Sequence, residues 1–512
     1  MRLADDPPEL TDSLTPWPAA ADGVPEAKLV DAVPPPATDR VLVHGIAWSA
    51  ASKWLTQIVS WASTIVVARL LTPNDYGLVG MAALYLGLVA LVSEFGVGSA
   101  IVTLRDLSDD AISQLNTLSV MIGVTIFGVS CAAARPLAAF FHTAALVPVV
   151  LTLSISFIVG SFKTVPNAML QRSFEFRTLA AIDTAKALFA AVLAVALALM
   201  GFHYWTLVIS EVCGVALATA LTVIRRPRPF ARPRLETLGR AITFSRQVLV
   251  GRVAWFVYSN SDFLVAGRML GQAALGAYDF AWTLTNIPVE KLTSLVSNVT
   301  PTVFASIQED TRALERSVLA VTEGIATVAF PVAIGLCLVS SDLIRGVFGV
   351  KWESAIIPLQ LLGIYTALRS VMPILPAALT VRGRTRFLMY HGIASAILFP
   401  AAFFWASRFG TLGIAGVWVA LYPISVIPII YLTCRIVTTW RAYWGALRGA
   451  TVATVAMATV VLAVTRSLPA SYPSLLRLAI EVTVGVVAYS GTVLTLFPER
   501  VAAFRRTLRD VL

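Results

Sequence analysis

Between residues 44 and 498 the chain is a close succession of long apolar segments, and this feature limits its possible folds more than any other. Hydrophobic residues make up 57% of the 512 residues and charged residues only 13%. A soluble domain carries about 25% charged residues, so this chain has too little polar surface to cover a globule of its size. One helix needs roughly 20 apolar residues to cross a bilayer, which leaves room for about fourteen spans. The sequence therefore predicts an all-α integral membrane protein.

Basic residues are unevenly distributed over the short connections between these segments. We place the spans at 44–71, 76–102, 111–133, 145–165, 179–200, 204–224, 241–268, 275–305, 315–340, 354–381, 385–407, 410–437, 446–466 and 475–498. Arginines gather in every second connection, above all in 225–240, and in the C-terminal tail. Because lysine and arginine on short loops stay in the cytosol, both termini are expected there. The basic excess thus reports topology, and no nucleic-acid partner is expected.

The chain divides into two halves by internal similarity. Ala-Arg-Leu-Leu at 68–71, with Gly77 and Ala82, matches Gly-Arg-Met-Leu at 267–270, with Gly276 and Ala281, at a constant offset of 199. This offset corresponds to six spans, an even number, so the two copies would be parallel repeats. The predicted organisation is two six-helix bundles followed by two C-terminal helices.

These halves set the expected domain boundaries. Residues 1–40 hold eight acidic and three basic residues without apolar periodicity, which indicates a disordered cytosolic tail. The predicted parts that follow are the first lobe at 41–224, a cytosolic linker at 225–240, the second lobe at 241–437, and the last two spans with the C-terminus at 438–512.

Polar side chains recur at helical spacing within several spans. In the eighth predicted span (275–305), Asp279, Asn286 and Glu290 fall within about 80° of one another around the helix axis, at 100° per residue. A charge at the bilayer centre costs about 2.5–3.5 kcal/mol, so such residues face water or other protein groups. The charged and amide residues concerned are Lys53, Gln57, Glu94, Arg252, Asp262, Asp279, Asn286, Glu290 and Arg369.

Two interpretations of these stripes remain open. They could line a water-filled central cavity, or pair into buried ion pairs such as Lys53 with Glu94 and Arg252 with Asp279. In the cavity interpretation the substrate faces Lys53, Gln57, Glu94, Arg252, Asn286 and Arg369. Asp262, Asp279 and Glu290 would then couple ion binding to transport, since desolvation favours protonation of a carboxylate near working pH.

Motifs for enzyme chemistry are missing. The sequence has no G-x-x-x-x-G-K-[ST] loop, no G-x-S-x-G elbow and no metal-ligand spacing, so neither an enzyme nor a cofactor is expected. A charged cluster around Trp352, on a predicted outside connection, is typical of an interfacial segment.

Several stretches resemble a known family: ARLLTPNDYGLVGMA (68–82), VPNAMLQRSFEFRTLAAID (165–183), SNSDFLVAGRMLGQAALGAYDFA (259–281) and FGVKWESAIIPLQLLG (348–363). They are similar to the polysaccharide-exporter branch of the multidrug/oligosaccharidyl-lipid/polysaccharide flippase superfamily, including Wzx-type flippases for lipopolysaccharide and exopolysaccharide. The resemblance implies alternating access in the bacterial inner membrane, driven by a proton or sodium gradient. It further implies undecaprenyl-pyrophosphate-linked oligosaccharide as substrate and membrane lipid around it. Whether the protein acts alone or beside a polymerase and a chain-length regulator is left open.

Three alternatives are kept. A multidrug antiporter on the same scaffold would have an acidic and aromatic cavity. A membrane polymerase or ligase would need a long outside loop, which the predicted connections do not provide. A flippase for peptidoglycan precursors would differ in substrate alone.

Overall fold

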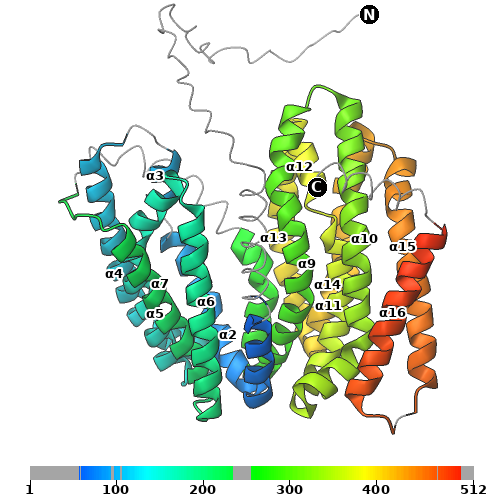
Figure 1. The fold of residues 1–512 in the computed structure, drawn as a ribbon, viewed down its shortest axis with the longest axis horizontal. Coiled ribbons are helices and arrows are strands. Elements are labelled where there is room, and N and C mark those ends of the chain that lie inside the picture. Colours follow the sequence, from blue (N-terminus) through cyan, green and yellow to red (C-terminus); the bar gives the residue numbers. More distant parts are fainter. Residues whose placement is uncertain are drawn as a thin grey trace, which may run out of the picture. The chain divides into compact units, whose positions relative to one another are not determined.

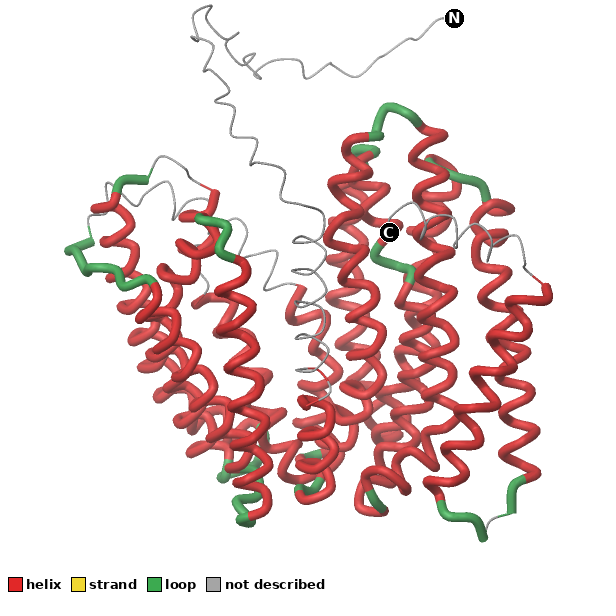
Figure 2. The backbone as a smooth tube through the Cα atoms, in the orientation of Figure 1, coloured by secondary structure: helices red, strands yellow, loops and turns green. Residues whose placement is uncertain are grey.

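The computed structural model describes residues 57, 59–93, 97–103, 107–233, 255–469 and 471–496. Regular structure in these ranges is helical throughout, with short connections and no strand (Figure 2). Residues Leu55–Leu512 form one compact unit, and Met1–Trp54 fall outside the described residues. The predicted site residues Lys53, Glu94 and Arg252 also lie outside them, as do the tail 1–40 and the end of the linker.

The helices form two groups along the chain (Figure 1). The first helix group consists of helix 59–70, α2 (Pro73–Ser93), α3 (Val97–Thr103), α4 (Asp109–Phe140), α5 (Leu146–Arg172), α6 (Phe176–Leu199) and α7 (Trp205–Arg225). The second helix group consists of segment 255–265, the π-helical turn η1 (Ala266–Leu270), α9 (Gln272–Ser306), α10 (Thr311–Leu343), the π-helical turn η2 (Ile344–Phe348), the 3₁₀ turn η3 (Val350–Ala355), α11 (Ile356–Ser370), α12 (Ile374–Val381), α13 (Thr385–Ala406), the 3₁₀ turn η4 (Ser407–Phe409), α14 (Gly410–Ile436), α15 (Trp440–Ser467) and α16 (Ser474–Leu496).

These helices lie where the apolar segments predicted spans. α6, for example, covers 176–199 against the predicted 179–200, and α13 covers 385–406 against 385–407. Within the described ranges, ten segments are long and apolar enough to cross a membrane. Helices satisfy every backbone hydrogen bond internally, which the bilayer core demands. The chain is a multi-pass membrane protein.

Polar caps fix where several helices begin. The Ser108 hydroxyl accepts a hydrogen bond from the Ala111 N–H at 3.2 Å and starts α4. The Asp310 carboxylate accepts from the N–H groups of Arg312 and Ala313 at 2.9 and 3.0 Å and starts α10. Such side chains satisfy the N–H groups that a helix leaves unpaired at its first turn.

α2 and α9 join the two helix groups, and they cross at two glycines. A Cβ atom on Gly77 would lie 1.8 Å from the carbonyl oxygen of Gln272, and one on Gly276 would lie 1.8 Å from that of Pro73. The two helix backbones therefore touch directly. The contact is reciprocal, because each glycine meets the first turn of the opposite helix.

Side chains next to this crossing tie the groups together at the ends where α2 and α9 begin. The Arg69 guanidinium donates to the carbonyl oxygens of Gly346, at 2.7 Å, and Val347. The Gln272 amide donates to the carbonyl oxygen of Asn74 at 2.8 Å. Arg268, from the second helix group, likewise contacts His142 of the first group and lies over the Phe140 ring.

Trp352 is part of this junction. Its side chain is fully buried, stacks on Phe280 with ring centroids 4.0 Å apart, and donates to the Ala68 carbonyl oxygen at 2.8 Å. The 3₁₀ turn η3 brings the indole against the end of helix 59–70. The charged neighbours Lys351 and Glu353 are the basis of the interfacial interpretation, which stays a prediction.

The beginning of the linker packs on α4. The Asn116 amide donates to the carbonyl oxygens of Arg228 and Pro229 at 3.3 and 3.2 Å. The Ala231 N–H donates to the Thr117 hydroxyl at 3.1 Å. These contacts place residues 228–231 beside the first turns of α4.

Candidate functional site

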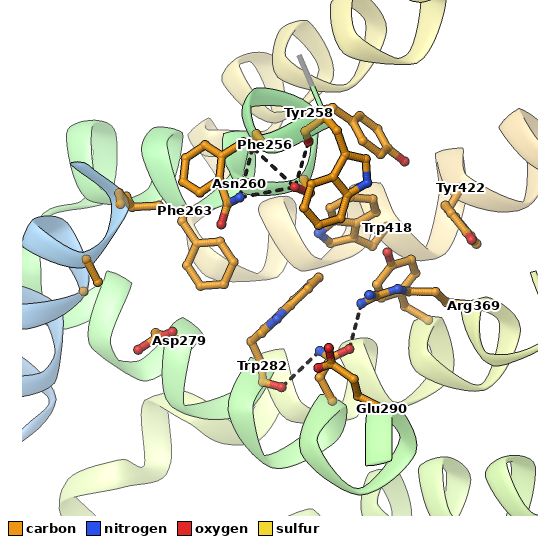
Figure 3. Close-up of a pocket in the computed structure, with 17 residues that line it drawn as sticks. Phe256, Tyr258, Asn260, Phe263, Asp279, Trp282, Glu290, Arg369, Trp418 and Tyr422 are labelled. Atoms are coloured by element: carbon orange, nitrogen blue, oxygen red, sulfur yellow. Dashed lines mark hydrogen bonds between the residues drawn. The ribbon is translucent and has the colours of Figure 1, made fainter. Parts of the chain in front are cut away.

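A pocket of about 450 Å³ lies where α2 meets the second helix group (Figure 3). Gly80, Ala83 and Leu84 of α2 form one side. The other side comes from segment 255–265 and from α9, α11 and α14, which contribute Trp255, Phe256, Tyr258, Ser259, Asn260, Phe263, Asp279, Trp282, Asn286, Glu290, Tyr365, Arg369, Trp418 and Tyr422. The pocket is thus bounded by both helix groups.

Among the described residues of this wall Arg369 is the only cation, and its position is fixed by three neighbours. Its guanidinium donates to the Asn286 side-chain oxygen at 2.8 Å. It also lies over the rings of Trp282 and Tyr365, with its central carbon 5.7 and 6.0 Å from their centroids. The Asn286 amide nitrogen in turn donates to the Trp282 carbonyl oxygen at 3.0 Å, which turns its oxygen toward Arg369. Cation–π contacts and a charge-assisted hydrogen bond therefore hold a positive charge at the pocket.

Two carboxylates of α9 face the same pocket. Glu290 follows Asn286 by one turn and is exposed, and it lies close enough to Arg369 to interact electrostatically. Asp279 is half-buried and accepts no hydrogen bond within the described part of the chain. In Figure 3 it lies across Trp282 from Arg369. Neither carboxylate forms an ion pair with Arg369 in the structure.

Asp262 is placed behind this wall rather than in it. Its side chain is fully buried and accepts hydrogen bonds from the Tyr278 hydroxyl at 2.6 Å and from the Trp418 indole nitrogen at 2.9 Å. The Trp418 ring stacks on Tyr365 with centroids 4.6 Å apart. Asp262 therefore fixes an aromatic side chain of the pocket and has no direct access to it.

The predicted stripe of span 8 is brought to one site. Asn286, Arg369, Asp279 and Glu290 all line the pocket, although Arg369 comes from a different helix. Gln57 does not line it. The paired-charge interpretation of Lys53 with Glu94 and of Arg252 with Asp279 falls partly outside the described residues and stays a prediction.

Sequence reasoning missed the aromatic side chains of the pocket. Tyr365 precedes Arg369 by four residues on α11, and Trp418 precedes Tyr422 by four on α14, so each pair shares a helix face. The sequence signal that could have found them is an aromatic residue, Tyr365, one helical turn before an arginine within a span, Arg369. It was hidden because apolar and aromatic residues are common on every span.

The fold and this pocket define the class of protein. A multi-pass helical membrane protein with a polar and aromatic pocket between two helix groups has an arrangement typical of transporters. The chain belongs to the polysaccharide biosynthesis protein family, whose model matches residues 66–357. The resemblance to polysaccharide exporters is confirmed.

Individual relatives agree with this family. The teichuronic acid biosynthesis protein TuaB of Bacillus subtilis (strain 168) is 26% identical over 474 residues, which are 91% of this chain and 97% of TuaB. The lipopolysaccharide biosynthesis protein WzxC of Escherichia coli (strain K12) is 24% identical over 380 residues, covering 73% of this chain and 76% of WzxC.

A solved structure shows the same fold. The inward closed conformation of the lipid II flippase MurJ superposes with a TM-score of 0.71, covering 89% of this chain and all of that one, at 13% identity. At this identity the likeness concerns the fold alone.

Proposed function

We propose that this protein is a flippase that moves undecaprenyl-pyrophosphate-linked oligosaccharide units across the bacterial inner membrane, for lipopolysaccharide or exopolysaccharide synthesis. The family match supports this proposal, and so do relatives named for the synthesis of polysaccharides. The observation that carries it is the pocket in which Asn286 holds Arg369 against aromatic rings. No enzymatic step is part of the proposal.

The pocket suits a charged glycan. The flat apolar faces of Trp282, Tyr365 and Trp418 can pack against the C–H faces of sugar rings. Hydroxyl groups can bond with Ser259 and Asn260, whereas an unpaired hydroxyl taken into hydrocarbon would cost several kcal/mol. Arg369 supplies a cation for an anionic sugar or phosphate. In a pocket with these groups, the glycan can cross the membrane without leaving its hydroxyl groups unpaired in hydrocarbon.

The topology belongs to the proposal. We infer fourteen spans with both termini and the 225–240 linker in the cytosol, and two parallel six-helix repeats at 41–224 and 241–437, followed by two further spans. The reciprocal crossing of Gly77 and Gly276, which the sequence alignment paired, supports such a repeat. In this topology the contacts of Arg69, Trp352 and Arg268 lie at the outer face, so that face is closed in this conformation.

Fusions test that topology. Alkaline phosphatase joined after residue 232 or 441 should be inactive, and a fusion after 408 should be active. An active fusion at 232 contradicts the fourteen-span arrangement.

Ion coupling is the further part of the proposal. Asp279 faces the pocket without a hydrogen-bond donor in the described part of the chain, so it is free to bind a proton or a sodium ion. Asp262 and Glu290 are two further carboxylates of this region among the described residues. Binding and release of the ion by such a carboxylate would shift the equilibrium between the inward-open and outward-open conformations of the pocket.

A multidrug antiporter is the second candidate, and one observation favours it. The pocket combines two carboxylates with aromatic rings, which suits cationic apolar drugs. Arg369 opposes this candidate because a fixed cation repels such compounds. Expression should therefore leave the efflux of ethidium unchanged.

The decisive experiment measures transfer of the lipid-linked sugar. Liposomes holding the purified protein and a fluorescent undecaprenyl-pyrophosphate oligosaccharide are treated with an impermeant quencher. Wild-type protein should expose the inner-leaflet label and Arg369→Gln should not, while Arg466→Gln at the end of α15 serves as control. If the wild type leaves the inner-leaflet label protected, the proposed function is wrong.

A further inference from the structure

Charged side chains also lie within the spans of the first helix group, away from the pocket. Lys186 is near the middle of α6, and its ammonium forms an ion pair with the Glu211 carboxylate of α7 at 2.8 Å. Lys163 lies on α5, roughly two and a half turns before the end of that helix. Asp183 is exposed one turn before Lys186. The polar stripes recognised in the sequence included none of these four residues.

The exposed fractions of the Lys186 and Glu211 side chains indicate whether this ion pair faces protein or water. The side chain of Lys186 is 29% exposed and that of Glu211 is 53% exposed. Both helices are long and apolar enough to cross a membrane, so these groups lie at membrane depth. Charged groups at that depth face protein or a water-filled space, because exposure to lipid is costly. The exposed parts of Lys186 and Glu211 therefore face water.

Lys163 differs from Lys186 in having no bonded carboxylate. It is half-buried, and among the described residues no hydrogen bond or ion pair reaches its ammonium. The charges of Lys186, Asp183 and Glu211 act on it only from a longer distance. A half-buried cation without a partner in a helix that is long and apolar enough to cross a membrane is unfavourable, and an anion beside it would relieve that cost.

We propose that Lys163 and Lys186 form an anion-binding subsite, which binds the pyrophosphate of the lipid-linked substrate. Glu211 is the carboxylate from which the Lys186 ammonium is released when the pyrophosphate arrives. This inference rests on the proposed function and assigns the pyrophosphate to the first helix group, whereas the aromatic pocket takes the sugars.

The chemistry of the three groups fits these roles. Ammonium groups form strong charge-assisted hydrogen bonds with phosphate oxygens. The two ammonium groups are near enough to interact electrostatically, and a pyrophosphate has two phosphoryl groups with which to bind them. Glu211 pairs with Lys186 alone. Glu211 then competes with the ligand for Lys186. This competition gives substitutions at Lys163 and Glu211 effects of opposite sign.

The test measures lipid binding by native mass spectrometry of the purified full-length protein. The probes are undecaprenyl pyrophosphate, undecaprenol and phosphatidylglycerol. Lys163→Gln should weaken binding of the pyrophosphate lipid roughly tenfold, the usual effect of losing a hydrogen bond to a charged group. Lys163→Arg should retain most of the affinity, and Glu211→Gln should increase it. None of the three should change binding of undecaprenol, and Arg466→Gln should change nothing.

The outcomes separate the possible explanations. Weaker binding by both Lys163→Gln and Glu211→Gln, with lower melting temperatures, would mean that the residues only hold the helices together, and the subsite is then wrong. An equal loss of phosphatidylglycerol binding would make this a site for bulk anionic lipid and would also overturn it. Absence of pyrophosphate-lipid binding by the wild type counts against the proposed function itself, whereas wild-type binding with unchanged variants counts against the subsite alone.

Discussion

Gly77 and Gly276 face each other where α2 crosses α9, and a Cβ atom on Gly276 would lie 2.7 Å from the Gly77 nitrogen. Neither position has room for a side chain. Because these helices join the two helix groups, this close approach determines how the groups meet.

The first prediction concerns that crossing. Gly77→Ala or Gly276→Ala should destabilise the protein by about 1–3 kcal/mol, the usual cost of overpacking, because the added methyl meets backbone atoms that cannot turn aside. The melting temperature in detergent measures this, and transport activity should fall with it. Gly324→Ala in α10 is the matched control: among the described residues, no atom beyond its own turn of helix lies within 4 Å of where its Cβ would be, and alanine is the better helix former. Equal melting temperatures for all three variants would contradict the prediction.

A second prediction concerns Trp352. Trp352→Phe keeps a ring against Phe280 but removes the N–H that the Ala68 carbonyl oxygen accepts. Leaving a buried acceptor unpaired costs about 1–3 kcal/mol, so the unfolding midpoint should drop. Trp444→Phe, at a position that is 57% exposed, should have little effect. If both variants melt alike, the indole hydrogen bond contributes nothing.

A third prediction concerns pH. Glu175 lies between α5 and α6, outside the spans, and the Arg226 guanidinium beside it holds the pKa of its carboxyl below the ordinary 4.5. A carboxyl with a lowered pKa in the folded protein stabilises it above the ordinary pKa, and this contribution disappears as the pH falls through the lowered value. Glu175→Gln should therefore melt below the wild type at neutral pH and converge with it in acid. Melting curves at several pH values test this.

Solvent moderates the same ion pair. Both side chains are partly exposed, so salt should reduce the difference between wild type and Glu175→Gln. Arg226→Gln removes the other partner and should reproduce the neutral-pH loss. A difference that persists at low pH would assign the effect to packing instead of charge.

The sequence predicted the helices well because bilayer crossing imposes a length and an apolar composition on each one. α14 spans 410–436 where 410–437 was predicted, although it contains Pro423 and Pro428. The stripe of Asp279, Asn286 and Glu290 was also predicted, since one helix fixes the phase of its own residues.

Contacts between helices were beyond such reasoning. At 100° per residue Asp262 lies on the same face of the predicted span 241–268 as Ser259, but Tyr278 and Trp418 cover it. Packing partners from α9 and α14 decide that burial, and helical periodicity contains no information about them. Lys186 and Glu211 were missed for a similar reason: they lie on different helices, and only their contact makes them a feature.

The last prediction separates Asp279 from Asp262. Asp279 faces the pocket without a hydrogen-bond donor within the described residues, so Asp279→Asn removes a charge and breaks no observed contact. If Asp279 binds the coupling ion, this variant should keep the wild-type melting temperature. Its transport should no longer respond to an imposed proton or sodium gradient.

Asp262→Asn should behave in the opposite way. The substitution weakens two hydrogen bonds, from Tyr278 and Trp418, by replacing a charged acceptor with a neutral one. Because bonds to charged groups contribute roughly 1.5–3 kcal/mol and neutral ones about 1, the melting temperature should fall. The gradient response of the protein that remains folded should persist, since Asp279 is intact. Loss of the gradient response in Asp262→Asn alone would transfer the coupling role to Asp262 and leave Asp279 as part of the pocket wall.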